Sequence, residues 1–186
     1  IVVEVPNTFE RRLAGVRQLI AQGYQVRLNY IVCEANFRHA EDFARFAARE
    51  MPGFKWIQFS YCKGMGRAKG NELIMPRFEE AAPFLNAAFK ACKESKIDFD
   101  VDHIPVCFVI DYKDHHADYR KMREHKPGVH LAEKQQIAEC DGCVMREACP
   151  GPRRDYLEVY GELRSGSRVC QFSGISLACS CNASMS

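Results

Sequence analysis

Segments with helical and with strand periodicity alternate three times along residues 8–103. In the helical stretches apolar residues recur every three or four positions, and each of these stretches is followed by a short two-faced run. The predicted helices cover residues 8–22, 37–49 and 77–94, and the predicted strands lie within residues 26–32, 55–61 and 98–103. This order is typical of a parallel α/β architecture. Three strands are too few to close a barrel, so the pattern alone leaves both an open sheet and part of a barrel.

Single residues mark where the predicted helices begin. Asn7 or Thr8 can cap the first helix, and Asn36 is expected to cap the second. Pro83 is expected in the first turn of the third helix, where its missing amide hydrogen costs little.

The chain changes character after this region. Residues 111–139 are rich in charges and contain His115 and His116, so we expect an exposed loop with a helix near residues 131–139. Beyond Gly161 the sequence becomes rich in serine, glycine and cysteine without a sustained period. We therefore expect domains over residues 1–104 and 105–163, followed by an irregular tail over residues 164–186.

Composition excludes some functions. A formal net charge of +2 gives no reason to expect nucleic acid as a partner, and the absence of a long apolar run argues against a membrane span. Three of the ten cysteines crowd into one loop, which suits a metal in a reducing cytoplasm better than a disulfide scaffold. The chain starts at Ile1 on apolar residues and without methionine, so we expect a fragment of a longer protein.

The crowded cysteines carry the strongest chemical signal. Cys140 and Cys143 form a C-x2-C pair, which lets two sulfurs reach one metal or cluster from a single turn, and Cys149 follows closely. The Pro-Gly-Pro sequence after Cys149 ends any helix and exposes backbone amides that can donate to sulfur. Cys107, expected at the end of the last strand, is the best-placed fourth ligand. Spacing alone does not distinguish zinc from an iron–sulfur cluster.

These motifs occur in an order that resembles a known family. The stretches "GVRQLIAQGYQVRLNYIVCEANFRHAEDFARFA", "WIQFSYCKGMGRAKGN" and "IPVC", followed by C-x2-C-x5-C-x-G ahead of "DYLEVYG", resemble the C-terminal half of a radical S-adenosylmethionine enzyme. The most similar branch contains the cofactor and peptide maturases with an auxiliary iron–sulfur cluster. The resemblance covers about residues 8–163.

The resemblance implies a fold and cofactors. The expected fold is α/β, the C-terminal half of a partial (β/α)6 barrel followed by a small Cys-rich cluster-binding domain. It implies an auxiliary [4Fe-4S] cluster on Cys107, Cys140, Cys143 and Cys149, with S-adenosylmethionine bound by the full-length protein. A peptide or small molecule is the implied substrate, and an electron donor protein is an additional partner.

One expected motif does not occur in this sequence. Radical S-adenosylmethionine enzymes hold their catalytic cluster with C-x3-C-x2-C, in the N-terminal half, and this spacing occurs nowhere here. We therefore expect that half to be missing and the fragment alone to be inactive. The sequence assigns no catalytic residue.

Three residues are candidates for contacts with S-adenosylmethionine. Asn29 and Ser60 are polar residues on the strand faces that would look into a barrel, and Arg67 lies in "GMGRA" after the second strand. The plainer interpretation is that strand-face polar residues meet solvent and that Arg67 belongs to an ordinary loop. A plainer function also competes, namely a non-catalytic zinc- or cluster-binding α/β module.

Overall fold

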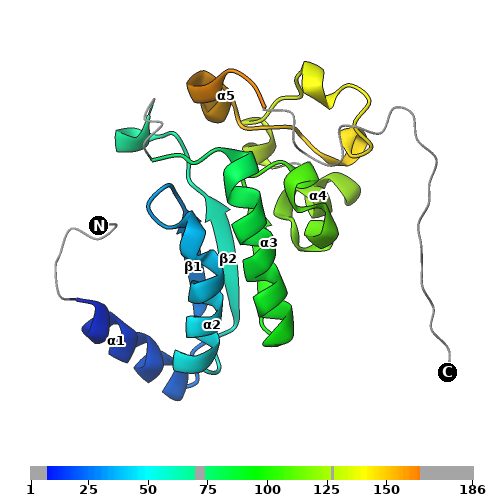
Figure 1. Cartoon of the computed structure of the whole chain (residues 1–186). Helices are drawn as coiled ribbons and strands as arrows, with labels where there is room; N and C mark the ends of the chain where they lie inside the picture. Colours follow the sequence, from blue (N-terminus) through cyan, green and yellow to red (C-terminus); the bar gives the residue numbers. More distant parts are fainter. Residues whose placement is uncertain (1–7, 70–73, 127, 164–186) are drawn as a thin grey trace, which may run out of the picture.

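The protein is an α/β structure built around a three-stranded parallel sheet (Figure 1). This computed structural model describes residues 8–69, 74–126 and 128–163. Its principal elements are the strands β1 (Arg27–Val32), β2 (Trp56–Tyr61) and β3 (Asp98–Asp102) and the helices α1 (Phe9–Ala21), α2 (Ala40–Glu50), α3 (Phe78–Glu94), α4 (Ala117–Arg123) and α5 (Arg154–Tyr160). The predicted alternation and the parallel pairing of the strands are therefore confirmed.

Short 3₁₀ turns connect these elements. They are η1 (Phe37–His39), η2 (Gly66–Ala68), η3 (Val106–His115), η4 (Val129–Leu131), η5 (Ala138–Cys140) and η6 (Arg146–Ala148). Within the described residues, no helix has the length and apolar character needed to cross a membrane.

The sheet has the order β1-β2-β3, and its two faces differ. Helices α2 and α3 lie side by side over one face, against a layer of apolar and aromatic residues (Figure 1). Phe59 of β2 is fully buried there and lies near the rings of Phe89 and Phe99. The opposite face carries polar rows, in which Asn29 is paired in register with Gln58, and Gln58 with Asp100. Because Asn29 is exposed, this polar face is open at β1.

The segment after β3 packs at the carboxyl end of the sheet. Helix α5 lies beyond the arrowhead of β2 (Figure 1). The ring of Tyr156 is fully buried and stacks on Phe78 at 3.8 Å between centroids. Tyr160 follows one turn later, 4.8 Å from Tyr156, and donates its hydroxyl to the carbonyl of Met75. The two tyrosines share one face of α5, which packs on the start of α3.

Two predicted helix starts are wrong in detail. Pro83 is the sixth residue of α3, since that helix begins at Phe78, so it lies beyond the first turn and removes a helical hydrogen bond. Asn36 precedes η1 but makes no capping bond with its side chain. Its amide instead accepts from the N–H of Cys33 and donates to the carbonyl of Ile31, which fixes the loop after β1.

The expectations for residues 105–139 are also corrected. Cys107 does not end a strand, because β3 stops at Asp102 and Cys107 lies in η3. Instead of a helix near residues 131–139, the chain forms α4 earlier and then 3₁₀ turns. His116 is fully buried rather than solvated, and His115 stacks on Phe99 at 4.1 Å. The predicted tail over residues 164–186 lies outside the described residues.

The Tyr156–Phe78 stack gives a test of how firmly the segment is attached. We expect Tyr156→Ala to lower the free energy of unfolding by about 3–5 kcal/mol, because it removes a fully buried ring from a packed interface. Tyr24→Ala is the control, since that ring is 62% exposed, and it should change stability by less than about 0.5 kcal/mol. Chemical denaturation measures both, and equal effects would contradict the packing described.

Candidate metal centre

The cysteine-bearing loop is a run of tight turns. The N–H of Cys143 donates to the carbonyl of Cys140 at 3.1 Å, and the N–H of Arg146 donates to the carbonyl of Cys143 at 3.0 Å. Gly142, between the two cysteines, has a φ of +76°, a left-handed conformation that glycine adopts without strain. The C-x2-C spacing therefore produces the compact turn that the sequence predicts.

Gln136 and Gly151 hold this loop together. The side-chain amide of Gln136 donates to the carbonyls of Arg146 and Cys149, at 2.5 and 3.0 Å. Gly151 has a φ of +86°, and a Cβ atom there would lie only 2.1 Å from the carbonyl oxygen of Gln135. The loop can thus close only with glycine between the two prolines.

Four cysteines line one cavity. Its lining includes Cys107 from η3 together with the three loop residues Cys140, Cys143 and Cys149. The cavity has about 330 Å³ of unfilled space, including its open side. Leu163 and Pro105 provide apolar walls, and Arg146 lies at the same cavity. The structure thus brings together the four cysteines that the sequence singled out.

Backbone amides reach the sulfur of Cys149. Burial raises the pKa of this thiol, whereas hydrogen bonds from the backbone of Gly151 and Val106 act in the opposite direction and favour the thiolate. Val106 adjoins Cys107, so this contact joins the loop to the segment after β3. Such N–H···S contacts are typical of sulfurs that bind metals. Among the described residues, however, no group of three or more His, Cys, Asp or Glu side chains is arranged closely enough to hold a single metal ion.

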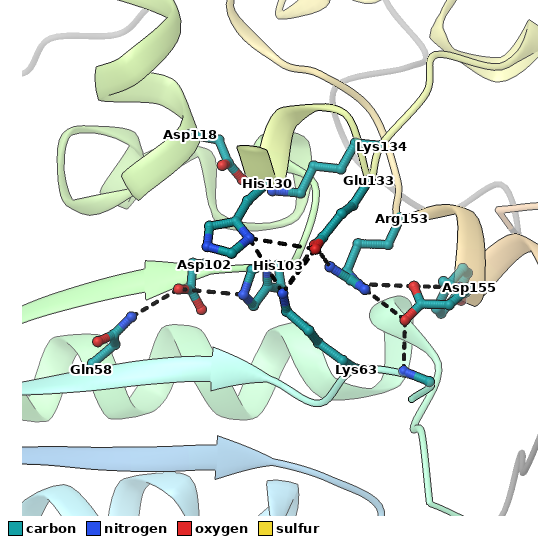
Figure 2. Close-up of polar contacts among 12 residues, drawn as sticks. Gln58, Lys63, Asp102, His103, Asp118, His130, Glu133, Lys134, Arg153 and Asp155 are labelled. Atoms are coloured by element: carbon teal, nitrogen blue, oxygen red, sulfur yellow. Dashed lines mark hydrogen bonds and ion pairs between the residues drawn. The ribbon is translucent and has the colours of Figure 1, made fainter. Parts of the chain in front are cut away.

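A charged network connects this loop to the carboxyl end of β2 (Figure 2). Lys63, just after β2, donates to Glu133 at 3.0 Å, and Arg153 donates to both Glu133 and Asp155. Asp155 in turn accepts the N–H of Gly64 at 2.6 Å. Although burial opposes ionisation of Glu133, its hydrogen bonds from Lys63 and Arg153 lower its pKa to about 2.

A second network, formed by buried side chains, is centred on Lys134 and Asp118. Lys134 donates to Asp118, and both side chains are 2% exposed. His116 accepts the N–H of Asp118 on Nδ1 at 3.1 Å and donates from Nε2 to the carbonyl of Ile104 at 2.7 Å. His116 thereby ties the start of α4 to the segment after β3. Burial lowers its pKa, so the ring is neutral.

Asp102 and His103 lie at the carboxyl end of β3, beside the first network (Figure 2). Gln58 donates to Asp102 at 2.8 Å, and the Ser60 hydroxyl also hydrogen-bonds to this carboxylate. Burial raises the pKa of Asp102. Burial and the charges of Lys134, Lys63 and Arg153 lower the pKa of His103 to about 3.

The structure describes two of the three side chains that are candidates for contacts with S-adenosylmethionine. Asn29 and Ser60 are on the same face of the sheet, as predicted, with Asn29 exposed and Ser60 buried against Asp102. Arg67 belongs to η2, but its side chain lies outside the described residues. Sequence reasoning gave Lys63 and Asp102 no role. Their position directly after or at the end of a predicted strand was the available signal, because ligands collect at the carboxyl ends of parallel strands.

The fold and the site together define an α/β protein with a thiol-lined cavity and a charged network at the carboxyl edge of its sheet. Comparison with known proteins adds no family to this description: no family model, no curated protein and no solved structure matches the chain.

The fit of Gly151 can be tested directly. We expect Gly151→Ala to lower stability by more than about 2 kcal/mol, since it combines a left-handed backbone with a clash against a carbonyl. Gly142→Ala is the matched control, because φ is also positive there but no atom lies within 4 Å of the added Cβ, so about 1 kcal/mol is expected. Amide hydrogen exchange over residues 134–153 should rise much more in the first variant than in the second.

Because His103 is buried, we expect the stability of the protein to depend on pH. His103 has a folded pKa of about 3, below its ordinary value of 6.5, so the unfolded chain binds a proton that the folded chain does not. Its contribution to stability is complete above pH 6.5 and is lost as the pH falls towards 3. We expect His103→Asn to reduce the loss of thermal stability between about pH 7 and about pH 5, where ordinary carboxylates remain ionised. Identical pH profiles for the two proteins would contradict this.

Proposed function

We propose that this chain is part of a radical S-adenosylmethionine enzyme and that residues 105–163 hold its auxiliary four-iron iron–sulfur cluster. The observation that carries the proposal is the single cavity lined by Cys107, Cys140, Cys143 and Cys149. The resemblance of the sequence motifs to that family is independent of this geometry and supports the same four ligands. The full enzyme would act on a peptide or small molecule.

The donor set fits such a cluster. Thiolates are the ligands that iron–sulfur clusters take, and a bound cluster would supply single-electron chemistry. The backbone N–H groups of Gly151 and Val106 stabilise negative charge on the Cys149 sulfur, and Arg146, whose guanidinium is paired with Asp141, also lines the cavity. Leu163 and Pro105 shield one side from water. These residues would hold the cluster and moderate its charge.

The sheet supports the barrel part of the proposal. In a half barrel, the strand face that looks inward is polar and lacks a helical cover. The face of β1 and β2 that carries Asn29 and Ser60 has this character, with Asn29 exposed. We propose that Asn29, Ser60 and Arg67 contact S-adenosylmethionine in the complete enzyme, which also requires a C-x3-C-x2-C cluster that this sequence does not contain.

The alternative is a non-catalytic module that binds zinc or a cluster only for stability. Zinc accepts the same four thiolates. Anaerobic reconstitution with iron and sulfide, and separately with zinc, distinguishes the two: a brown protein with iron and sulfide in about equal amounts supports the cluster. A colourless protein that holds stoichiometric zinc and takes up no iron supports the module.

Cysteine variants test the ligands. We expect Cys143→Ser and Cys107→Ser each to reduce cluster loading severalfold, and Cys143→Ser also to increase hydrogen exchange over residues 140–161, because few apolar residues hold that loop in place without metal. Cys33→Ser is the control: this half-buried thiol follows β1 and does not line the cavity. If Cys107→Ser still loads the cluster fully, Cys107 is not the fourth ligand, and the site consists of the three loop cysteines.

A further inference from the structure

His103 has a strained backbone at the end of β3. Its φ is +66°, a left-handed conformation that costs a residue with a side chain about 1 kcal/mol or more. The turn brings the imidazole to the same side as Asp102, with Nε2 at 3.6 Å from its Oδ2 (Figure 2). Strain of this kind persists only where the surrounding structure imposes it, and it is concentrated at functional sites.

Two polar atoms of this pair are buried without a hydrogen-bond partner in the part of the chain that the structure describes. They are Oδ1 of Asp102 and Nδ1 of His103. The His103 residue is 8% exposed, and leaving such an atom unsatisfied costs about 1–3 kcal/mol. The carboxylate attracts the imidazole proton to Nε2, which makes Nδ1 an acceptor. The pair therefore offers two acceptors and no donor to a ligand.

The neighbouring carboxylates are paired with cations, whereas Asp102 is paired with none that the structure describes. Each neighbouring carboxylate has a cation: Glu133 has Lys63 and Arg153, Asp118 has Lys134, Asp155 has Arg153 and Asp100 has Arg120. Among the described residues, Asp102 makes no ion pair except the one to the neutral His103, and its hydrogen bonds come from the uncharged Gln58 and Ser60. Asp102 thus has no directly paired cation among the described residues, although the charge of Lys134, which is paired with Asp118, also acts on it.

Asp102 lies on the polar face of the sheet, where it is paired in register with Ser60, and Ser60 is paired with Ile31, which is 43% exposed. The Asp102 side chain keeps 14% of its surface exposed, but Oδ1 itself is buried, so neighbouring side chains must move to admit a ligand to that atom. The rings of His103 and His130 lie 5.7 Å apart and nearly perpendicular.

We propose that Asp102 and His103 bind the cationic nitrogen group of a ligand, a guanidinium or a primary ammonium. The ligand's N–H groups would donate to Asp102 Oδ1 and His103 Nδ1, and its charge would neutralise the carboxylate. Both unpartnered atoms then gain hydrogen bonds, and the left-handed backbone at His103 would serve to place the imidazole for this contact. Assigning this group to the substrate, as a basic peptide or an amine-bearing metabolite, rests on the proposed function, whereas the binding itself needs no cluster.

Nuclear magnetic resonance of the protein with ¹⁵N-labelled histidine tests the proposal without any cluster. The chain is titrated with methylguanidinium and methylammonium chloride, and with sodium acetate at equal ionic strength. We expect one of the cations to give a saturable shift of the His103 Nδ1 resonance, of the size that a new hydrogen bond to this nitrogen produces. Acetate should give none.

Two variants locate the binding. Asp102→Asn should weaken the binding of that cation about tenfold or more, which corresponds to about 1.4 kcal/mol. Asp100→Asn is the matched control, since Asp100 lies on the same face of β3 but is already paired with Arg120, and it should bind as the original protein does. Backbone amide spectra check that both variants remain folded, and His103→Asn, which tolerates the left-handed backbone, provides a second variant at the site.

Several results would overturn the proposal. No saturable shift with either cation would mean that water alone occupies the position. Equal shifts with acetate, or unchanged binding in Asp102→Asn, would exclude this carboxylate as the recognition group. Each of these results leaves the iron and sulfide measurements on the cysteine site unaffected, and a failure of cluster loading leaves the titration equally informative, so the two proposals can fail separately.

Discussion

The buried guanidinium of Arg153 is the contact on which the arrangement of this protein depends. Its side chain is 4% exposed and pairs with Glu133 and Asp155, which come from either side of the cysteine loop. Asp155 also accepts the N–H of Gly64, so the pair attaches the loop to the end of β2. Removing one partner of a buried ion pair leaves an uncompensated charge, at a cost of about 3–5 kcal/mol. The loop therefore has one stable position on the sheet.

That position places two sites at the same edge of the molecule. His103 and Cys107 lie on one short connection after β3, whose carbonyl at Ile104 accepts from the buried His116. Cys107 lines the thiol cavity, and His103 belongs to the Asp102–His103 pair, so this connection contributes a residue to each site. Because the rigid anchor at His116 fixes the connection, both sites keep their geometry relative to the strand ends. The proposed function, in which electrons pass to a bound substrate, would require a fixed arrangement of this kind.

Local patterns predicted the regular elements well and the irregular segment poorly. The two faces of β1 followed from the alternation of Leu28 and Tyr30 with Asn29, because side chains on a strand point to opposite sides. The charged segment containing His116 was expected to be solvated, yet this ring is fully buried. Its hydrogen bonds to Ile104 and to the start of α4 satisfy both ring nitrogens, and such partners cannot be recognised from the neighbouring sequence.

The sequence by itself determined the order of helices and strands, the α/β class, and the cluster of Cys140, Cys143 and Cys149 in one loop, since periodicity and short-range spacing carry this information. That Cys107 lines the same cavity depends on the tertiary structure, because it lies in η3 and not at a strand end. Only the tertiary structure decided that Lys63, Asp102 and His103 share an edge, that Asp102 is paired with no cation among the described residues, and that Gly151 admits no side chain against Gln135. These features depend on contacts between residues far apart in the chain. Burial then sets their chemistry, because an unpaired charge or polar atom is costly only where water is excluded.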